Sequence, residues 1–127
     1  MMDKKSEIFV VDDDDAVRDS LCIMLATAYP SVTGYASGER FRAEFRPQPR
    51  NCLVIDIHMP EMTGLDVIDR LAAMKTRIPS VLLTGRIDSA LRARAIASGV
   101  HRLLDKPVDY SELVSAINAA MTNPLLH

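Results

Sequence analysis

The sequence predicts an α/β domain built on a doubly wound parallel sheet of five strands. Five short, mostly apolar runs alternate along the chain with segments whose apolar residues recur at helical spacing. Four of the runs lead into acidic, hydroxyl or amine side chains: Asp12 and Asp13, Asp56, Thr84, and Lys106. Parallel strands bring their carboxyl ends to one edge of a sheet, where open α/β folds bind ligands. We therefore expect these side chains to share one crevice.

The strands are predicted from runs rich in Val, Ile, Leu and aromatic residues that are bounded by polar or turn-forming residues. In chain order they lie near residues 8–12, 32–36, 52–56, 80–84 and 101–105. A helical segment follows each of them, as a doubly wound parallel sheet requires.

The first two helices are predicted from apolar spacing and from the residues that end them. The first ends near Tyr29-Pro30 and carries its apolar stripe on Val17, Leu21, Met24, Leu25 and Ala28. The second runs from Ser37 through Phe41 and Phe45. It should stop before the Pro47-Gln48-Pro49 segment, because proline breaks the hydrogen bonding of a helix interior.

The other three helices follow the third, fourth and fifth strands. The third starts after Gly64 and carries Leu65, Ile68, Leu71 and Ala72. The fourth, near residues 88–98, has only Leu91, Ala95 and Ile96 as its stripe, and Gly99 is placed to cap its carboxyl end. The last opens with Asp109 and Glu112 in capping-box spacing and should bury Leu113, Ile117, Ala120 and Met121.

Length and composition indicate one globular domain. The 127 residues are 48% apolar and 25% charged, and we expect an ordered core over about residues 7–122. The net charge of -2 gives no electrostatic reason for this domain alone to bind nucleic acid. The polar N-terminus lacks a signal-peptide stretch and no apolar run could span a membrane, so we expect a cytoplasmic protein. Cys22 and Cys52 lack metal-binding spacing and are expected to be reduced core thiols.

Four consecutive aspartates, Asp12 to Asp15, follow the first predicted strand. Alone, such a run is equally typical of a solvated turn at a helix N-terminus. An EF-hand is excluded because its glycine and terminal glutamate are absent. Asp12 and Asp13 should converge with Asp56, and like charges about 4 Å apart repel by roughly 4 kcal/mol at an effective dielectric of 20. A cation is therefore needed; an all-oxygen site favours Mg²⁺, and its negative charge disfavours FMN.

Asp56 lies where an apolar strand gives way to a loop, in Val-Ile-Asp-Ile-His-Met-Pro-Glu-Met-Thr-Gly. A lone aspartate at a strand end is more often a turn former or a helix cap. Beside a metal and an ammonium group it can instead attack phosphorus and form an aspartyl phosphate. Thr84 and Lys106 would then supply a hydroxyl and a cation to the phosphoryl oxygens. The Lys106-Pro107 bond is a candidate cis peptide that would aim the lysine.

Four motifs occur together in one order: Val-Val-Asp12-Asp13-Asp14, Ile-Asp56-Ile-His-Met-Pro-Glu-Met-Thr-Gly64, Leu-Leu-Thr84-Gly and Asp-Lys106-Pro107. With them the chain resembles, over essentially its full length, a response-regulator receiver domain of two-component signalling. The resemblance implies a flavodoxin-like fold with strand order 2-1-3-4-5 and helices on both faces of the sheet.

The resemblance also implies a role for each residue. Asp56 would accept phosphate from the phosphohistidine of a histidine kinase or phosphotransfer protein. Asp12, Asp13 and Asp56, with the backbone carbonyl of His58, would hold Mg²⁺. Thr84 and Lys106 would bind the phosphoryl oxygens. A receiver catalyses its own phosphorylation and dephosphorylation and is otherwise a signalling protein, not an enzyme.

Two positions depart from the family pattern. Many receivers have an aromatic residue three positions before the lysine that moves inward on phosphorylation, whereas this chain has Leu103. The signal should therefore travel by another repacking of the fourth helix and fifth strand. Gly85 replaces the commoner alanine after the hydroxyl residue, which should loosen that loop. The Thr84-Gly85 pair resembles receivers of helix-turn-helix transcription regulators.

Four arginines gather around the fourth helix and fifth strand, a region that many receivers use for partners or homodimers: Arg86, Arg92, Arg94 and Arg102. A solvated basic surface is an equally good interpretation of this cluster. Because no apolar run approaches the length of a membrane span, we expect no membrane partner.

Two other functions stay open. Asp13-Asp14-Asp15-Ala16-Val17 fits the Asp-x-Asp-x-Val signature of haloacid-dehalogenase-type phosphatases with Asp13 as nucleophile, although Asp56 is then unexplained. A binding module could also keep the receiver fold and signal without phosphate, although it would not need the acids, hydroxyl and lysine. Phosphate incorporated at Asp56, at Asp13 or at neither distinguishes the three functions.

Overall fold

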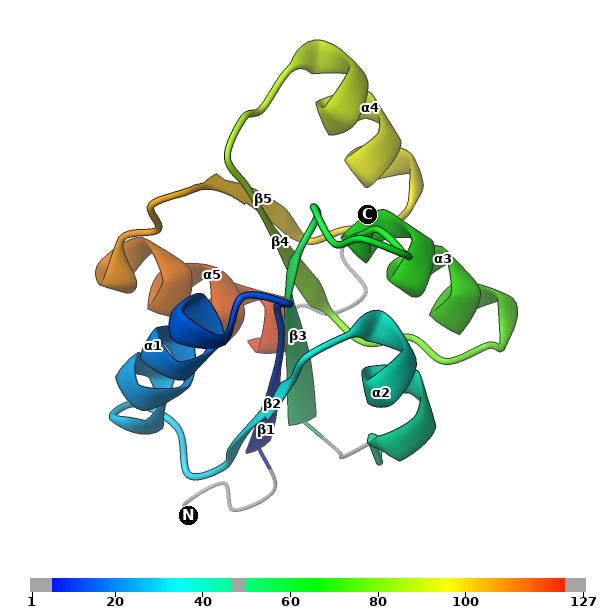
Figure 1. Cartoon of the computed structure of the whole chain (residues 1–127). Coiled ribbons are helices and arrows are strands. Elements are labelled where there is room, and N and C mark those ends of the chain that lie inside the picture. Colours follow the sequence, from blue (N-terminus) through cyan, green and yellow to red (C-terminus); the bar gives the residue numbers. More distant parts are fainter. Residues whose placement is uncertain (1–5, 47–49, 123–127) are drawn as a thin grey trace.

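The computed structural model describes residues 6–46 and 50–122, which form one parallel sheet with helices on both faces (Figure 1). The strands are β1 (Ser6–Val11), β2 (Val32–Tyr35), β3 (Arg50–Asp56), β4 (Ser80–Thr84) and β5 (Arg102–Asp105). The helices are α1 (Asp15–Ala26), α2 (Gly38–Glu44), α3 (Gly64–Ala73), α4 (Ser89–Ala97) and α5 (Tyr110–Thr122). All pairings are parallel and the strand order is β2-β1-β3-β4-β5, which confirms the predicted fold class and order.

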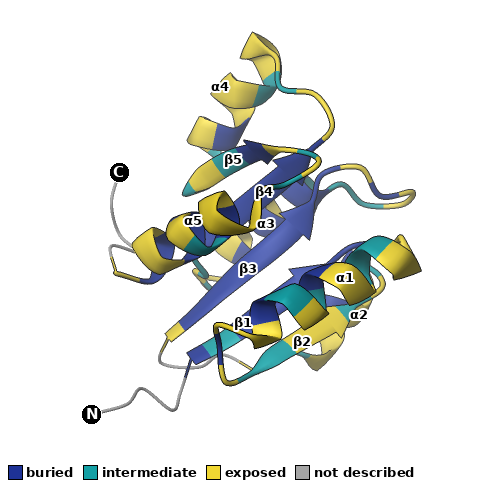
Figure 2. Ribbon diagram, turned by 90° about the vertical axis from the view of Figure 1, so that its left-hand side faces the viewer, coloured by how far each residue is buried: buried dark blue, intermediate teal, exposed yellow. Residues whose placement is uncertain are grey.

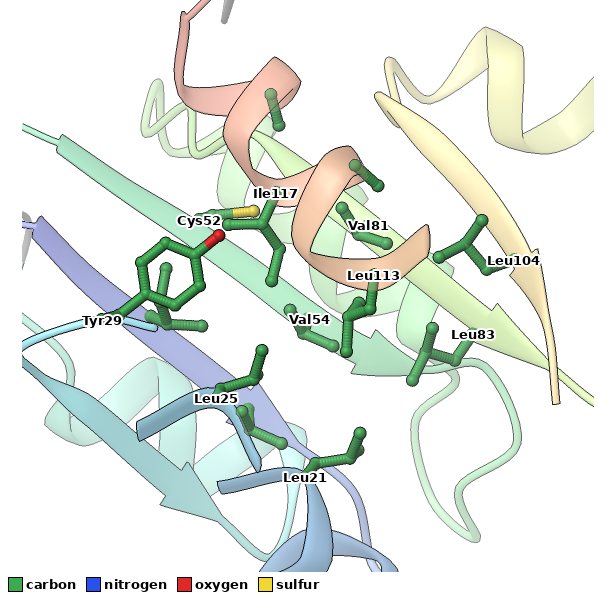
Figure 3. Close-up of a cluster of buried hydrophobic side chains, with 14 of the residues drawn as sticks. Leu21, Leu25, Tyr29, Cys52, Val54, Val81, Leu83, Leu104, Leu113 and Ile117 are labelled. Carbon is green, nitrogen blue, oxygen red and sulfur yellow. The ribbon is translucent and has the colours of Figure 1, made fainter. Parts of the chain in front are cut away.

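Each face of the sheet carries its own apolar core, because successive residues of a strand point to opposite faces. On one face, Ile8 and Val10 of β1 pack with side chains of α1 and α5. Figure 3 shows this core with Leu25 of α1 and Leu113 of α5. On the other, Phe9 and Val11 pack with side chains of α2 and α3. Figure 2 shows β3 buried along nearly its whole length, as expected of a central strand covered on both faces.

Side-chain caps fix where four helices begin. The N-caps of α1 to α4 are Asp14, Ser37, Thr63 and Asp88, and each accepts a hydrogen bond from the backbone three residues on. At α5, Asp109 Oδ2 accepts a hydrogen bond from the Glu112 N–H at 3.0 Å, as half of the predicted capping box would. Gly99, with φ of 81°, follows α4 in the left-handed conformation and confirms the predicted cap.

Some predicted helix positions differ from the structure. Helix α1 ends at Ala26, before Tyr29-Pro30, because the Thr27 hydroxyl and N–H both turn back to the Met24 carbonyl. Ala28 is therefore exposed beyond the helix. Ala72 and Ile96, which were expected on apolar faces, are also exposed. Each follows a buried residue by one position, and a step of about 100° around a helix turns a side chain away from a narrow buried stripe.

The predicted range 80–84 matches β4 at both ends, and the bounds of the other four strands lie within two residues of their predicted ranges. The predicted break at Pro47-Gln48-Pro49 lies outside the described residues, and α2 itself ends at Glu44.

Both cysteines are free, and burial raises the pKa of the Cys52 thiol. Among the described residues, no helix is long and apolar enough to cross a membrane.

Candidate functional site

The predicted site residues lie at the carboxyl edge of the sheet. Asp12 follows β1 directly, Asp56 is the last residue of β3, Thr84 is the last residue of β4, and Lys106 follows β5. The parallel register of the three central pairings keeps these strand ends nearly level. The expected meeting of the strand ends is therefore confirmed at the level of the backbone.

Three carboxylates cluster at this edge. Asp12, Asp13 and Asp56 each offer an oxygen, and these oxygens lie within 4.8 Å of one another. Asp12 and Asp56 are only 1% and 4% exposed, whereas Asp13 is exposed. Two of the three negative charges are therefore held away from water, where repulsion between them is poorly screened.

Lys106 supplies a positive charge to this cluster. Its Nζ lies 2.7 Å from Asp56 Oδ1 and 3.6 Å from Asp12 Oδ2. Partial burial opposes the charged form, but attraction by Asp56 and then by Asp12 outweighs it, so the pKa of Lys106 is raised. The N–H of Lys106 donates to the Thr84 carbonyl at 2.7 Å, which fixes the backbone at this position. The Lys106-Pro107 peptide is cis, as the sequence suggested.

One ammonium does not balance three carboxylates. Burial raises the pKa of Asp12 even though the Asp14 N–H and the charge of Lys106 oppose the shift. Among the described residues, neither Asp12 Oδ2 nor Asp56 Oδ1 accepts a hydrogen bond of good geometry, so the short distance to Lys106 is a contact between charges. Two buried carboxylates that share one ammonium, beside an exposed third carboxylate, fit a hard divalent cation such as Mg²⁺.

Thr84 is fully buried, and its hydroxyl is already engaged. Thr84 Oγ1 donates to the Arg86 carbonyl and accepts from the Arg86 N–H, both at 3.2 Å. A phosphoryl oxygen at the site would have to compete with this local turn for the hydroxyl. The structure therefore places Thr84 on the correct strand end with its side chain held by the loop that leads to α4.

The loop after β3 is held against the carbonyl of Asp56. The Gly64 N–H donates to the Ile57 carbonyl at 3.1 Å, and a Cβ at Gly64 would lie 2.6 Å from the Asp56 carbonyl oxygen. Only glycine permits this approach. His58, two residues after Asp56, has an exposed side chain, and in the described chain no backbone N–H donates to its carbonyl, which stays available as a ligand.

Two features of the site were not predicted. Arg18 Nη1 donates to the Asp12 carbonyl at 2.8 Å, while Nη2 pairs with Asp15 at 2.6 Å, so Arg18 braces the acidic loop. Thr63 and Asp66 form a complete capping box at the start of α3. The Thr-x-x-Asp spacing in the sequence was a signal for the box, whereas no sequence pattern marks the contact of Arg18.

Leu103 is partly buried and packs on the core cluster that contains α2 and α3. It also lines a shallow hollow between α4 and β5, together with Ile96 and Arg102. Leucine has no polar group at the end of its side chain. Leu103 therefore packs in the core and has no polar group to move between solvent and the interior.

Comparisons with known proteins agree with this geometry. The family model described as "Response regulator receiver domain" matches residues 8–118. The response regulator protein TodT of Pseudomonas putida is 34% identical over 121 residues, which is 95% of this chain and 53% of that protein. The transcriptional regulatory protein FixJ of Rhizobium meliloti is 35% identical over 114 residues, which is 89% of this chain and 55% of FixJ. The chain thus spans about half the length of these curated relatives.

Solved structures agree with the sequence relatives. The response regulator StyR superposes with a TM-score of 0.85 at 34% identity, over 93% of this chain and 60% of StyR. The FixJ-N crystal structure superposes with a TM-score of 0.82 at 30% identity, over 100% of this chain and 99% of FixJ-N. The likeness therefore extends across the whole fold.

Proposed function

Because the chain belongs to the response-regulator receiver domain family, we propose that Asp56 is its phosphoacceptor and that a partner kinase's phosphohistidine is the donor. The observation that carries this proposal is the pairing of a buried Asp56 carboxylate with Lys106 Nζ at 2.7 Å. A buried carboxylate is a nucleophile with little competing hydration, and the ammonium stays beside it to meet the incoming negative charge.

In the proposed transfer, a carboxylate oxygen of Asp56 attacks phosphorus and forms an acyl phosphate. The bond between phosphorus and the donor imidazole nitrogen breaks, and its electron pair stays on the imidazole, which takes up a proton. Lys106 then moves its charge from a carboxylate to a phosphoryl oxygen. Thr84 donates its hydroxyl to a second oxygen after releasing the Arg86 carbonyl.

Asp12, Asp13 and Asp56, with the His58 carbonyl, are the groups that would hold Mg²⁺. When bound, the metal would supply the positive charge that a phosphoryl group requires and that one lysine cannot provide alone. Arg18 keeps the Asp12 loop in place for this purpose. With the same residues, we propose that the chain catalyses its own phosphorylation and the hydrolysis of the product.

The relatives carry the names of response and transcriptional regulators and are about twice as long, so we propose that this receiver controls a separate output. The exposed Ile96 and the arginines near α4 and β5 make this face the candidate surface for an output domain or a second copy of the chain. If these arginines contacted only solvent, this face would not transmit the phosphorylation signal to an output.

Intact-mass spectrometry tests the function. The full chain is incubated with acetyl phosphate and Mg²⁺, and we expect one added phosphoryl group that is lost on exposure to base or hydroxylamine. EDTA should prevent the addition, and Asp56→Asn should abolish it with an unchanged circular dichroism spectrum. A folded wild-type chain that gains no phosphate would favour a receiver-fold module that signals without phosphate.

A further inference from the structure

Helix α4 is weakly anchored to the rest of the domain. Ala95 is its only buried residue, and Leu91 is partly buried, while Ile96 is 71% exposed. Figure 2 shows most of α4 exposed, and Figure 1 shows it at the periphery of the fold next to α3. Because α4 buries so little apolar surface, polar contacts contribute more than usual to holding it against the rest of the domain.

Arg94 provides polar contacts from α4 to α3. Its Nη2 lies 3.2 Å from Asp66 Oδ1 and 3.5 Å from Asp69 Oδ2. Within the described chain, these are the ion pairs that join the two helices. Arg92 lies two positions earlier on the same helix and is exposed, and no ion pair among the described residues includes it.

Asp66 connects this contact to the start of α3. Its Oδ2 accepts the Thr63 N–H at 3.1 Å, and its own N–H donates to Thr63 Oγ1 at 3.1 Å. Gly64, which follows Thr63 in the chain, lies against the carbonyl of Asp56. An uninterrupted set of contacts therefore runs from Arg94 through the capping box to the backbone of Asp56.

We propose that Arg94 is a positioning residue for the Asp56 loop: by holding Asp66 it orders the cap of α3, and it thereby couples the placement of α4 to phosphorylation. The coupling to reactivity rests on the proposed function of Asp56, whereas the ordering of the cap does not. The lowered pKa of Asp66, due first to the Thr63 N–H and also to Arg94, agrees with one carboxylate serving both partners. Because coupling is reciprocal, phosphate on Asp56 should alter how α4 is held.

Hydrogen exchange on the unphosphorylated full chain tests the structural step. Arg94→Gln keeps the stem and helix propensity but removes the charge, and Arg92→Gln is the matched control. In Arg94→Gln we expect exchange at residues 63–66 and in α4 to accelerate about two- to fivefold, the range of an exposed ion pair. Asp69→Asn, which spares the cap, should accelerate exchange in α4 more than at residues 63–66. Salt at about 0.5 M should reduce the difference between the two arginine variants.

The rate of phosphorylation by acetyl phosphate tests the coupling. Arg94→Gln should change the rate about two- to fivefold with Mg²⁺ affinity unchanged, whereas Arg92→Gln should match the wild type. Arg94→Lys keeps the charge and should bring the rate part of the way back to that of the wild type. Equal exchange at residues 63–66 in the two glutamine variants would overturn the proposal, as would equal phosphorylation rates. A wild type that takes up no phosphate on Asp56 would instead refute the proposed function, and the exchange comparison would still decide whether Arg94 orders the cap.

Discussion

Replacing Gly64 by alanine tests whether the Asp56 loop depends on close backbone contact. A Cβ at this position would lie 2.6 Å from the Asp56 carbonyl oxygen and 2.9 Å from Leu82 Cδ1. Ordinary contact begins near 3.4 Å, so the Asp56 backbone and α3 must separate by about 0.8 Å. Such overpacking costs about 1–3 kcal/mol, and the lower entropy of the unfolded alanine chain returns only about 0.4–1 kcal/mol.

We therefore expect Gly64→Ala to lose about 1–2 kcal/mol of unfolding free energy, or about 4–8 °C in Tm for a domain of this size. Gly85→Ala is the matched control, because its Cβ would meet no atom within 4 Å and its φ lies outside the left-handed region. The control should be as stable as the wild type or more stable by up to about 1 kcal/mol. Thermal and urea unfolding followed by circular dichroism give both values. Gly64→Ala as stable as Gly85→Ala would refute the close approach.

Three further predictions concern charge, burial and switching. Lys106→Ala should still bind Mg²⁺, because the carboxylates remain, but should lose phosphorylation or the response to it, and unchanged rates would remove Lys106 from the site. Burial raises the pKa of Tyr29 to about 12, so the neutral phenol stabilises the fold below pH 10. About 3 kcal/mol of unfolding free energy should be lost as pH rises from 10 to 12. The difference in urea stability between the wild type and Tyr29→Phe should change over this pH range, and a difference independent of pH would contradict the prediction. Beryllofluoride with Mg²⁺ should change hydrogen exchange more at residues 85–91 than at residues 103–104, and the reverse would make Leu103 itself the switch.

The sequence predicted best those features that depend on strand ends. Asp12, Asp56, Thr84 and Lys106 each stand next to an apolar run, and parallel pairing brings such positions together whatever the side-chain details. Contacts between elements were harder to predict. Arg94 reaches Asp66 only because α4 lies beside α3, and the sequence offered Arg94 merely as one of several surface arginines. Ile96 was assigned to a buried stripe because spacing alone does not show that α4 buries so little.

Site mapping of the phosphate tests the central claim most directly. The chain is phosphorylated with acetyl phosphate and Mg²⁺, and borohydride reduction converts an aspartyl phosphate to homoserine, which peptide mass spectrometry locates. We predict homoserine at position 56 and unmodified aspartate at position 13. Homoserine at position 13 would contradict this assignment and would favour a nucleophile of the haloacid-dehalogenase type, while modification at neither position would refute phosphoacceptor function.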